Sequence, residues 1–275
     1  MGNETTTSTQ ADSLFTSWVS AQILEEARPY NVMRSFFRYA GPEKANAYDF
    51  PIITDPGAAS ASYSEGTGLT NTAISSTDET ATATAKGAMA TVTDELDEIS
   101  LFDSYSVFGN VLVRSVLERF ETDATALLDD FSNTTGSAGV PTTWATLLEA
   151  LNQLEQRDQT GEAVFVLDPA QVGDVRDDVG TSGASIHTNR EETQMATLGG
   201  YAGFNVGPAG VFQTSLVTST GGAVFIKGVA LGLYEIRPIR TETERDASLP
   251  GTEVVVTQRY GSVEIRDAAG ETILV

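Results

Sequence analysis

The strongest periodic pattern in the chain predicts one long amphipathic helix. Apolar residues recur there at steps of three or four, which keeps them on one helical face: Tyr105, Phe108, Leu112, Val116, Phe120, Ala124, Leu127 and Phe131. An acidic run at residues 94–98 comes before the helix, on the side that the helix dipole favours. Asn133 and Gly136 end the pattern. A helix of roughly 28 residues spans about 40 Å, which indicates a structural spine.

Residues 46–93 hold two alternating segments on either side of a stretch of small residues. Tyr48–Thr54 and Ala81–Thr93 alternate with the period of a strand. Between Gly57 and Thr91, 26 of 35 residues are alanine, glycine, serine or threonine, too little bulk for a separate core. This pattern predicts a long protruding hairpin, which needs an external surface because an isolated two-stranded hairpin is marginal in water. A low-complexity linker is the alternative.

Residues 1–45 begin with a polar stretch and end in a segment rich in aromatic residues and arginine. Such residues are enriched in protein interfaces, so five of them are candidates for contacts between subunits: Tyr30, Arg34, Phe36, Phe37 and Arg38. The segment packs either on its own domain or as an arm on a neighbouring molecule. The residues alone leave both alternatives open.

The middle of the chain predicts alternating helices and strands. Residues 144–154 carry leucines at helical spacing, and Ala163–Leu167 is a short apolar run typical of a buried strand. A further helix is expected directly after that strand. Asp168 provides its N-cap, Pro169 its first position and Gln171 the capping box.

Residues 223–275 are mostly strand-forming, which makes the chain an α+β protein. The candidate strands are Ala223–Ile226, Leu231–Ile236, Glu253–Gln258, Val263–Arg266 and Thr272–Val275. A hairpin turn is expected at Arg259-Tyr260-Gly261, between the third and fourth of these strands.

Composition excludes several classes of protein. The net charge is −22, from 38 acidic and 16 basic residues, and such a surface repels nucleic-acid phosphates. The absence of cysteine excludes disulfides and thiolate sites, and the single histidine, His187, excludes multi-histidine metal sites. No apolar run reaches the ~18 residues of a membrane helix, and residues 1–10 lack a signal pattern. We therefore expect a soluble protein that is made in the cytoplasm and has no membrane partner.

A search for catalytic motifs finds none that is complete. Gly66-Thr67-Gly68 begins like a dinucleotide fingerprint, but Asn71 occupies the place of the third glycine. Adjacent acidic residues are expected in so acidic a chain and indicate a solvated face: Asp129/Asp130, Asp177/Asp178 and Glu191/Glu192. The sequence therefore predicts no catalytic residue, no metal ligand and no cofactor.

The basic residues gather near the two ends of the chain, close to acidic residues. Arginine binds carboxylates through two hydrogen bonds, so contacts between subunits would suit this arrangement; ordinary surface ion pairs are the alternative. Further candidate contact residues are Arg237, Arg240 and Arg245, together with Tyr63 and Lys86 in the small-residue segment.

The order of these parts resembles the Hong-Kong-97-type major capsid proteins of tailed phages and related viruses. The best local pieces are A-V-F-V-L-D-P-A-Q-V-G-D-V-R at 163–176, L-G-G-Y-A-G-F-N-V at 198–206 and A-V-F-I-K-G-V at 223–229. The specific feature is the succession of arm, hairpin, long helix, α/β middle and β-rich end.

The resemblance implies a division into parts and a structural role. It implies an N-terminal arm at 1–45, an extended loop at 46–93 that lies over an adjacent subunit, a peripheral domain at 94–139 and 229–275, and an axial domain at 140–228. The implied protein is not an enzyme. Its copies form the pentamers and hexamers of an icosahedral shell around viral double-stranded DNA, without sequence-specific DNA binding.

The resemblance also implies partners and a location. Scaffolding, portal and decoration proteins are candidate partners, and the protein would lie in the virion after synthesis in the host cytoplasm. Crosslinking is not expected, because Lys86 is the hairpin's only lysine and no partner for it can be placed. The alternatives are an encapsulin-type compartment, a phage tail protein and a small enzyme with an unrecognised carboxylate site.

Overall fold

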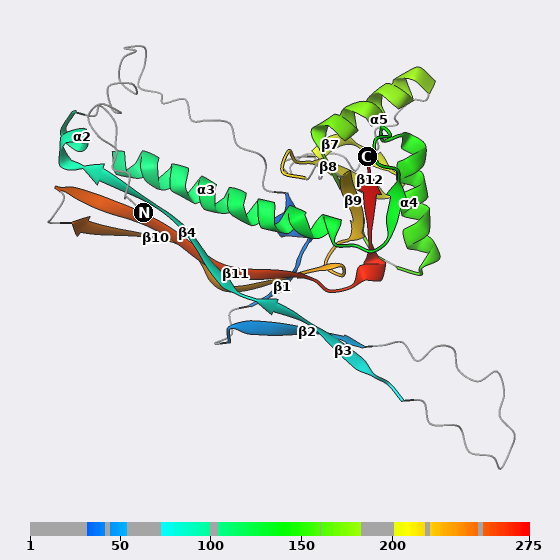
Figure 1. Cartoon of the computed structure of the whole chain (residues 1–275), viewed down its shortest axis with the longest axis horizontal. Coiled ribbons are helices and arrows are strands. Elements are labelled where there is room, and N and C mark those ends of the chain that lie inside the picture. Colours follow the sequence, from blue (N-terminus) through cyan, green and yellow to red (C-terminus); the bar gives the residue numbers. More distant parts are fainter. Residues whose placement is uncertain are drawn as a thin grey trace, which may run out of the picture.

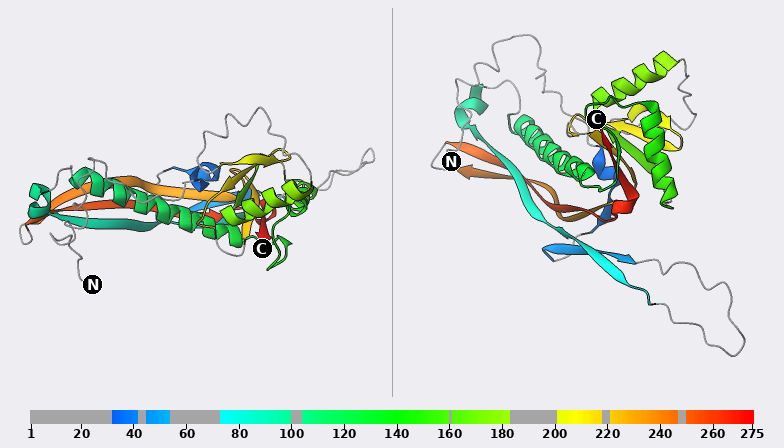
Figure 2. Two further views of the ribbon diagram at one scale, coloured as in Figure 1. Left: turned by 90° about the horizontal axis from the view of Figure 1, so that it is seen from above. Right: turned by 45° about the vertical axis from the view of Figure 1, so that its right-hand side comes forward.

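The computed structural model describes residues 32–41, 45–53, 73–99, 104–159, 161–182, 201–217, 221–246 and 250–275. They form a flat molecule in which a long sheet and helix lie beside a second sheet with its own helices (Figures 1 and 2). A hairpin leaves the long sheet on the side away from the long helix. No helix among these residues is both long and apolar enough to cross a membrane.

The long sheet has four strands in the order β1-β10-β11-β4. Their bounds are β1 (Arg38–Ala40), β4 (Thr84–Thr93), β10 (Leu231–Asp246) and β11 (Gly251–Glu264). Helix α3 (Ser104–Ala126) lies along this sheet and packs on β11 and β4. Leu112 and Val116 of the helix share an apolar cluster with Val254 and Val256 of the sheet. The alternation of β11 therefore places one face against α3 and leaves the other face away from it.

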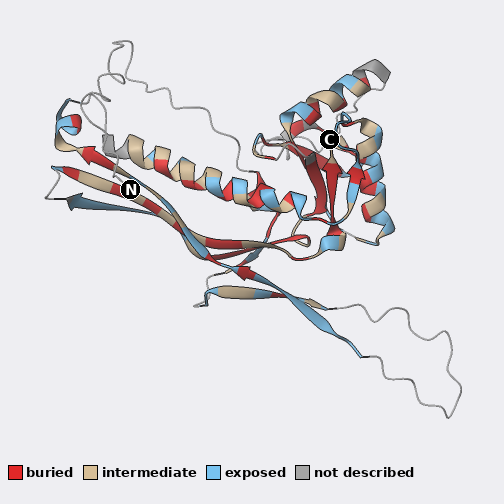
Figure 3. Cartoon of the chain, in the orientation of Figure 1, coloured by how far each residue is buried: buried red, intermediate tan, exposed pale blue. Residues whose placement is uncertain are grey.

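The second sheet has six strands in the order β5-β12-β9-β6-β8-β7. The bounds are β5 (Thr134–Gly136), β6 (Ala163–Leu167), β7 (Tyr201–Val206), β8 (Ala209–Gln213), β9 (Gly221–Ile226) and β12 (Gly270–Leu274), with helices α4 (Trp144–Gln156) and α5 (Pro169–Ser182). All five residues of β6 are buried, as a continuous apolar run in a central strand requires (Figure 3). The largest apolar core joins this sheet to α4 and to the end of α3.

The predicted start of α5 is confirmed. The Asp168 carboxylate accepts a hydrogen bond from the amide of Ala170 at 2.8 Å, and Gln171 accepts one from the amide of Asp168 at 3.3 Å. Thr143 caps α4 by accepting a hydrogen bond from the amide of Thr146 at 3.2 Å. These side chains satisfy amides that the first helical turn leaves without a backbone partner.

A two-stranded hairpin of β2 (Ala47–Ile53) and β3 (Ser76–Thr82) lies outside both larger sheets. The predicted first arm, Tyr48–Thr54, corresponds to β2. The expectation that Ala81–Thr93 forms the second arm is wrong, because only its first two residues belong to β3. The remainder is β4, which pairs with β11 in the long sheet. The alternation is real, but Ala83 separates two strands of different sheets.

Two further predictions near the long helix need correction. The helix ends at Ala126 and is followed by a 3-10 turn, η2 (Leu127–Asp129), so it is shorter than expected. The acidic residues before it form a separate short helix, α2 (Asp94–Ile99). Two more 3-10 turns are η1 (Met33–Phe36) and η3 (Asp267–Ala269).

The turn expected at Arg259-Tyr260-Gly261 is absent, because these residues continue β11 and pair with β10. Gly261 serves a different purpose: a Cβ atom there would lie 2.4 Å from the carbonyl oxygen of Thr82. The glycine allows the end of the hairpin to cross the sheet in direct contact with its backbone.

Candidate assembly surfaces

The segment Val32–Phe37 packs inside its own chain. Phe36 is 1% exposed and meets Phe212 and Phe225 edge to face, with ring centroids 5.0 and 6.0 Å away. Phe37 is buried in the same core, beside Phe120. Phe36 and Phe37 are therefore unavailable for a contact with a neighbour, which corrects that expectation for these two residues. The alternative, packing on the chain's own domain, holds for this part of the segment.

Arg34 also has partners within the chain. Its Nη2 atom lies 2.6 Å from the Glu235 carboxylate, and its guanidinium lies 5.5 Å from the centre of the Phe120 ring. Glu235 is 3% exposed, so Arg34 neutralises a charge that would be costly to bury alone. Arg38 and the neighbouring Tyr39, which is 57% exposed, remain on the surface. Tyr30 and Tyr63 lie outside the described residues.

A buried carboxylate of α3 holds the same segment in place. Glu121 is 1% exposed, and its Oε1 atom accepts hydrogen bonds from the amides of Val32 at 2.8 Å and Met33 at 3.0 Å. Burial raises the pKa of Glu121 to about 7, and the two amides only partly offset it. This role could not be predicted from the sequence, because Glu121 lies within an ordinary amphipathic pattern.

This carboxylate predicts a pH dependence of stability. Because the folded-state pKa lies above the usual value, the contribution of Glu121 is fully present below pH ~4.5 and is lost as the pH rises through about 7. Glu121→Gln should remove up to ~3 kcal/mol of the change in unfolding free energy between about pH 5 and about pH 8. Chemical denaturation of both proteins across that range measures it. Equal pH profiles would contradict the assignment.

The hairpin packs one face on the body of the chain and exposes apolar side chains on the other. Tyr48, Phe50 and Ile52 face the body, where they join a cluster around Tyr234. On the other face Ile53 is 67% exposed, and Ile74, just before β3, is 68% exposed. Most of β3 is exposed as well (Figure 3). These two isoleucines are not among the contact residues that the sequence predicts. Their signal is two large apolar side chains at the edges of a stretch of small residues.

Lys86 belongs to the body and not to the tip of the hairpin. It lies on β4, and its Nζ atom is 3.2 Å from the Asp123 carboxylate of α3. The same carboxylate pairs with Arg119 at 2.7 Å and accepts a hydrogen bond from the hydroxyl of Tyr260 at 2.7 Å. Lys86 thus helps to fix the sheet to the long helix.

The three C-terminal candidate arginines lie on one strand, β10, in different surroundings. Arg245 binds the Asp94 carboxylate through two hydrogen bonds of 3.0 and 2.7 Å, which lower the pKa of Asp94. Arg240 pairs with Glu242 at 2.6 Å, and both side chains are exposed. Arg237 has no ion pair within the described part of the chain, and its Nε atom is buried without a hydrogen-bond partner.

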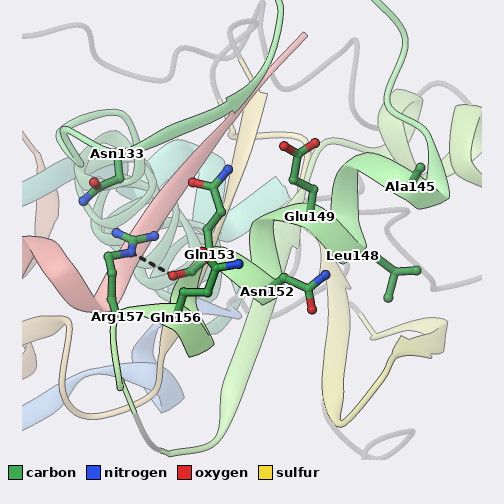
Figure 4. Close-up of a pocket in the computed structure, with 8 residues that line it drawn as sticks. All are labelled: Asn133, Ala145, Leu148, Glu149, Asn152, Gln153, Gln156 and Arg157. Atoms are coloured by element: carbon green, nitrogen blue, oxygen red, sulfur yellow. Dashed lines mark hydrogen bonds between the residues drawn. The ribbon is translucent and has the colours of Figure 1, made fainter.

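A shallow pocket of about 710 Å³ lies on the outer side of α4 (Figure 4). Its lining is mainly polar: Asn133, Ala145, Leu148, Glu149, Asn152, Gln153, Gln156 and Arg157. The guanidinium of Arg157 is already bound by Glu271 and by the backbone oxygens of Gln153 and Gly270. The pocket therefore presents amide side chains and the Glu149 carboxylate, while the guanidinium of Arg157 is already occupied.

The acidic pairs do not assemble into a metal site where the structure describes them. Asp129, Asp130 and Asp177 lie apart from any group of three or more potential ligands, and no such group occurs among the described residues. The Asp178 carboxylate accepts a hydrogen bond from the amide of Trp144 at 3.0 Å. Glu191, Glu192 and His187 lie outside the described residues.

No protein-family model and no curated protein sequence matches the chain. Solved structures match it over nearly its whole length. A chain from the capsid of the cyanophage P-SCSP1u has a TM-score of 0.72 at 16% identity, covering 96% of this chain and 93% of that one. The chain has the fold of phage capsid proteins.

Other structures with this capsid fold match equally widely. A chain from Mycobacterium phage Che8 has a TM-score of 0.69 at 16% identity, covering 94% of this chain and 98% of that one. A chain from the capsid of a native GTA particle has a TM-score of 0.69 at 15% identity, covering 98% of both chains. At such identities the capsid fold is shared while individual contacts are not transferred. The surfaces above therefore rest on the residues of this chain.

Proposed function

We propose that the chain is a major capsid protein, whose copies assemble into an icosahedral shell around the double-stranded DNA of a tailed phage. The observation that carries this proposal is the shared fold: chains from phage capsids and from GTA capsids match 94–99% of this chain. The two GTA capsids, native and empty, were both computed with C5 symmetry. Pentamers and hexamers are the oligomers that such a shell needs.

The exposed hairpin supports the proposal from within the molecule. Ile53 and Ile74 are each about two-thirds exposed on a two-stranded element, and a ribbon of two strands is marginal without a surface to lie on. A neighbouring copy can supply that surface. In a closed shell each such contact is repeated by symmetry, so modest contacts combine into a stable particle.

The parts of the chain take the following roles in this proposal. Residues 1–45 form an N-terminal arm, and residues 46–93 an extended loop over an adjacent subunit. Residues 94–139 and 229–275 form a peripheral domain with α3 as its spine, and residues 140–228 an axial domain at the symmetry axes. The contacts between subunits use Arg38, Arg237, Arg240 and Arg245, together with Tyr30 and Tyr63.

The surroundings of the protein follow from the same proposal. The subunit is made in the host cytoplasm and ends in the virion, with scaffolding, portal and decoration proteins as candidate partners. A net charge of −22 lets the shell enclose DNA without binding it by sequence. The role is structural and not enzymatic. An encapsulin-type compartment would instead retain a cargo peptide, and a tail protein would form rings or tubes.

Electron microscopy of the expressed chain tests the proposal. We expect closed, icosahedral particles of megadalton mass, formed with a co-expressed scaffolding protein where the chain alone does not assemble. Sedimentation gives the mass, and mass spectrometry of purified particles detects any cargo. A species of 29.1 kDa under all these conditions would contradict a shell role, and open tubes would favour a tail protein.

A further inference from the structure

The long sheet has one face that α3 leaves uncovered. Val254, Val256 and Tyr260 of β11 point toward α3 and are buried, so the residues between them lie on the opposite face. We call this opposite side the outer face. Its members include Val255, Thr257 and Arg259 on β11 and their cross-strand partners on β4 and β10.

The chain's own hairpin covers only part of the outer face. Tyr48 of β2 stacks on Tyr234 of β10 with ring centroids 5.5 Å apart, and Tyr234 is fully buried there. The part of the outer face that the hairpin covers ends at Asn46, whose side-chain oxygen accepts a hydrogen bond from Arg259. Beyond that point the described residues leave the outer face open, and Met89 of β4 is 45% exposed.

Two arginines, Arg237 and Arg259, are neighbours on the outer face at the end of the part that the hairpin covers. Arg237 of β10 is the direct cross-strand partner of Arg259 of β11, so both side chains lie on the same face. The register of β10 shifts on both sides of Arg237, and such irregularities re-aim a side chain. Like charges placed directly opposite each other destabilise a sheet. The pair therefore costs the isolated subunit free energy.

Nothing in the described part of the chain neutralises this pair. The Nε atoms of both Arg237 and Arg259 are buried without a hydrogen-bond partner. Asn46 is neutral, and neither arginine forms an ion pair with a described residue. A carboxylate is the group that two adjacent guanidiniums would bind most strongly, through charge-assisted hydrogen bonds.

We propose that the Arg237–Arg259 pair binds a carboxylate of a second copy of this chain, and that Asp78 of the hairpin supplies it. This inference rests on the proposed shell function and names one contact within it. The described hairpin strands carry Asp49, Asp78 and Glu79 and no basic residue. An acidic hairpin thus complements a basic site on the sheet.

Asp78 is the hairpin carboxylate best placed for this contact. It is exposed, and it lies on the same hairpin face as the exposed Ile53. Asp49 already accepts a hydrogen bond from Thr80 at 2.6 Å, and Glu79 lies on the other face, toward the chain's own Glu264. Asp78 and Ile53 together match the arginines and the exposed Met89 of the outer face.

The Asp78 carboxylate cannot reach the arginine pair of its own chain. Arg259 contacts the hairpin at Asn46, whereas Asp78 pairs with Pro51, five residues farther along β2. At ~3.3 Å per residue that separation is roughly 16 Å. The carboxylate must therefore come from another molecule.

A charge exchange tests the contact. The readout is the lowest protein concentration at which particles form, measured by light scattering and checked by electron microscopy. Arg237→Glu and Asp78→Arg should each raise that concentration at least about tenfold, because each leaves a like-charge pair at a repeated contact. The double variant Arg237→Glu/Asp78→Arg should return to within about threefold of the wild type.

Arg240 provides the matched control, because it lies on the same strand and already pairs with Glu242. Arg240→Glu combined with Asp78→Arg should show no recovery and should be at least as defective as Asp78→Arg alone. A purely structural role for Arg237 is tested by Arg237→Met, which should leave the thermal midpoint of the unassembled chain unchanged or higher. A lower midpoint with unchanged assembly overturns the inference.

The outcomes separate the contact from the function. If the wild type forms particles and the double variant stays as defective as the single variants, the contact with Asp78 is wrong and the shell function stands. If the Arg237 variants assemble like the wild type, the arginine pair is not a contact site. If the wild type forms no particles under any condition, the function and the contact fall together.

Discussion

Ile53→Asp/Ile74→Asp should abolish closed particles while leaving the subunit folded. Both isoleucines are about two-thirds exposed on the hairpin, so the isolated chain loses little when they change. Burying such a side chain at a neighbour contributes about 1.5–3 kcal/mol. The double variant removes two of these contributions from each subunit and adds two charges that resist burial. Because the contact is repeated around the shell, the loss of free energy at each contact adds up over the whole particle.

Three measurements on the double variant decide this prediction. Circular dichroism and the thermal midpoint of the unassembled chain should match the wild type, whereas electron microscopy should show no closed particles. Ser76→Asp is the matched control, because Ser76 pairs directly with Ile53 and its change adds a charge without removing an apolar side chain. The control should assemble far better than the double variant. Normal particles from the double variant would show that these isoleucines do not carry the contact.

The periodic patterns predicted those elements that a short local pattern of residues defines. The apolar stripe of α3, the continuous run of β6 and the cap at Asp168 each record a local geometry, and the structure contains all three. The boundary at Ala83 could not be predicted, because alternation continues through a change of sheet. The continuation of β11 through Gly261 was also not predictable. A glycine that allows two backbone segments to approach closely cannot be distinguished in the sequence from a glycine in a turn.

The candidate contact residues fall into two groups, aromatic residues and arginines, for which the sequence is informative to different degrees. Aromatic residues that suit an interface suit a core equally well, so the sequence could not tell that Phe36 belongs inside the chain. The sequence identified arginines as contact candidates, but it did not show which of them lack an acidic partner within the chain. Only the strand register shows that Arg237 faces another arginine while Arg240 has an acidic partner. Burial and pairing depend on distant parts of the chain, which residue types do not reveal.

A buried ion pair joins the parts of the second sheet to one another. Glu271 of β12 is fully buried and is bound by Arg157, which follows α4, and by the hydroxyl of Thr135 on β5. Arg157 also donates to the backbone oxygen of Gly270 at 3.3 Å. Burial raises the pKa of Glu271, whereas Thr135 and Arg157 lower it. The charged carboxylate therefore depends on its arginine.

Arg157→Met should cost about 3–5 kcal/mol of unfolding free energy, because it leaves Glu271 buried without its counter-charge. The folded-state pKa of Glu271 then rises further, so the cost should be smallest at low pH and grow as the pH rises through that pKa. Denaturant titration of the unassembled subunit measures both effects.

Arg157→Met/Glu271→Gln is the decisive control for this pair. Removing the second charge should recover about half or more of the loss, since a neutral pair has no uncompensated charge to bury. Thr135 retains an acceptor in the glutamine oxygen, so the remaining hydrogen bond survives. Additive losses from the two single changes would mean that the residues stabilise the subunit independently. Recovery would show that the position of α4 on the sheet depends on charge balance as well as on packing.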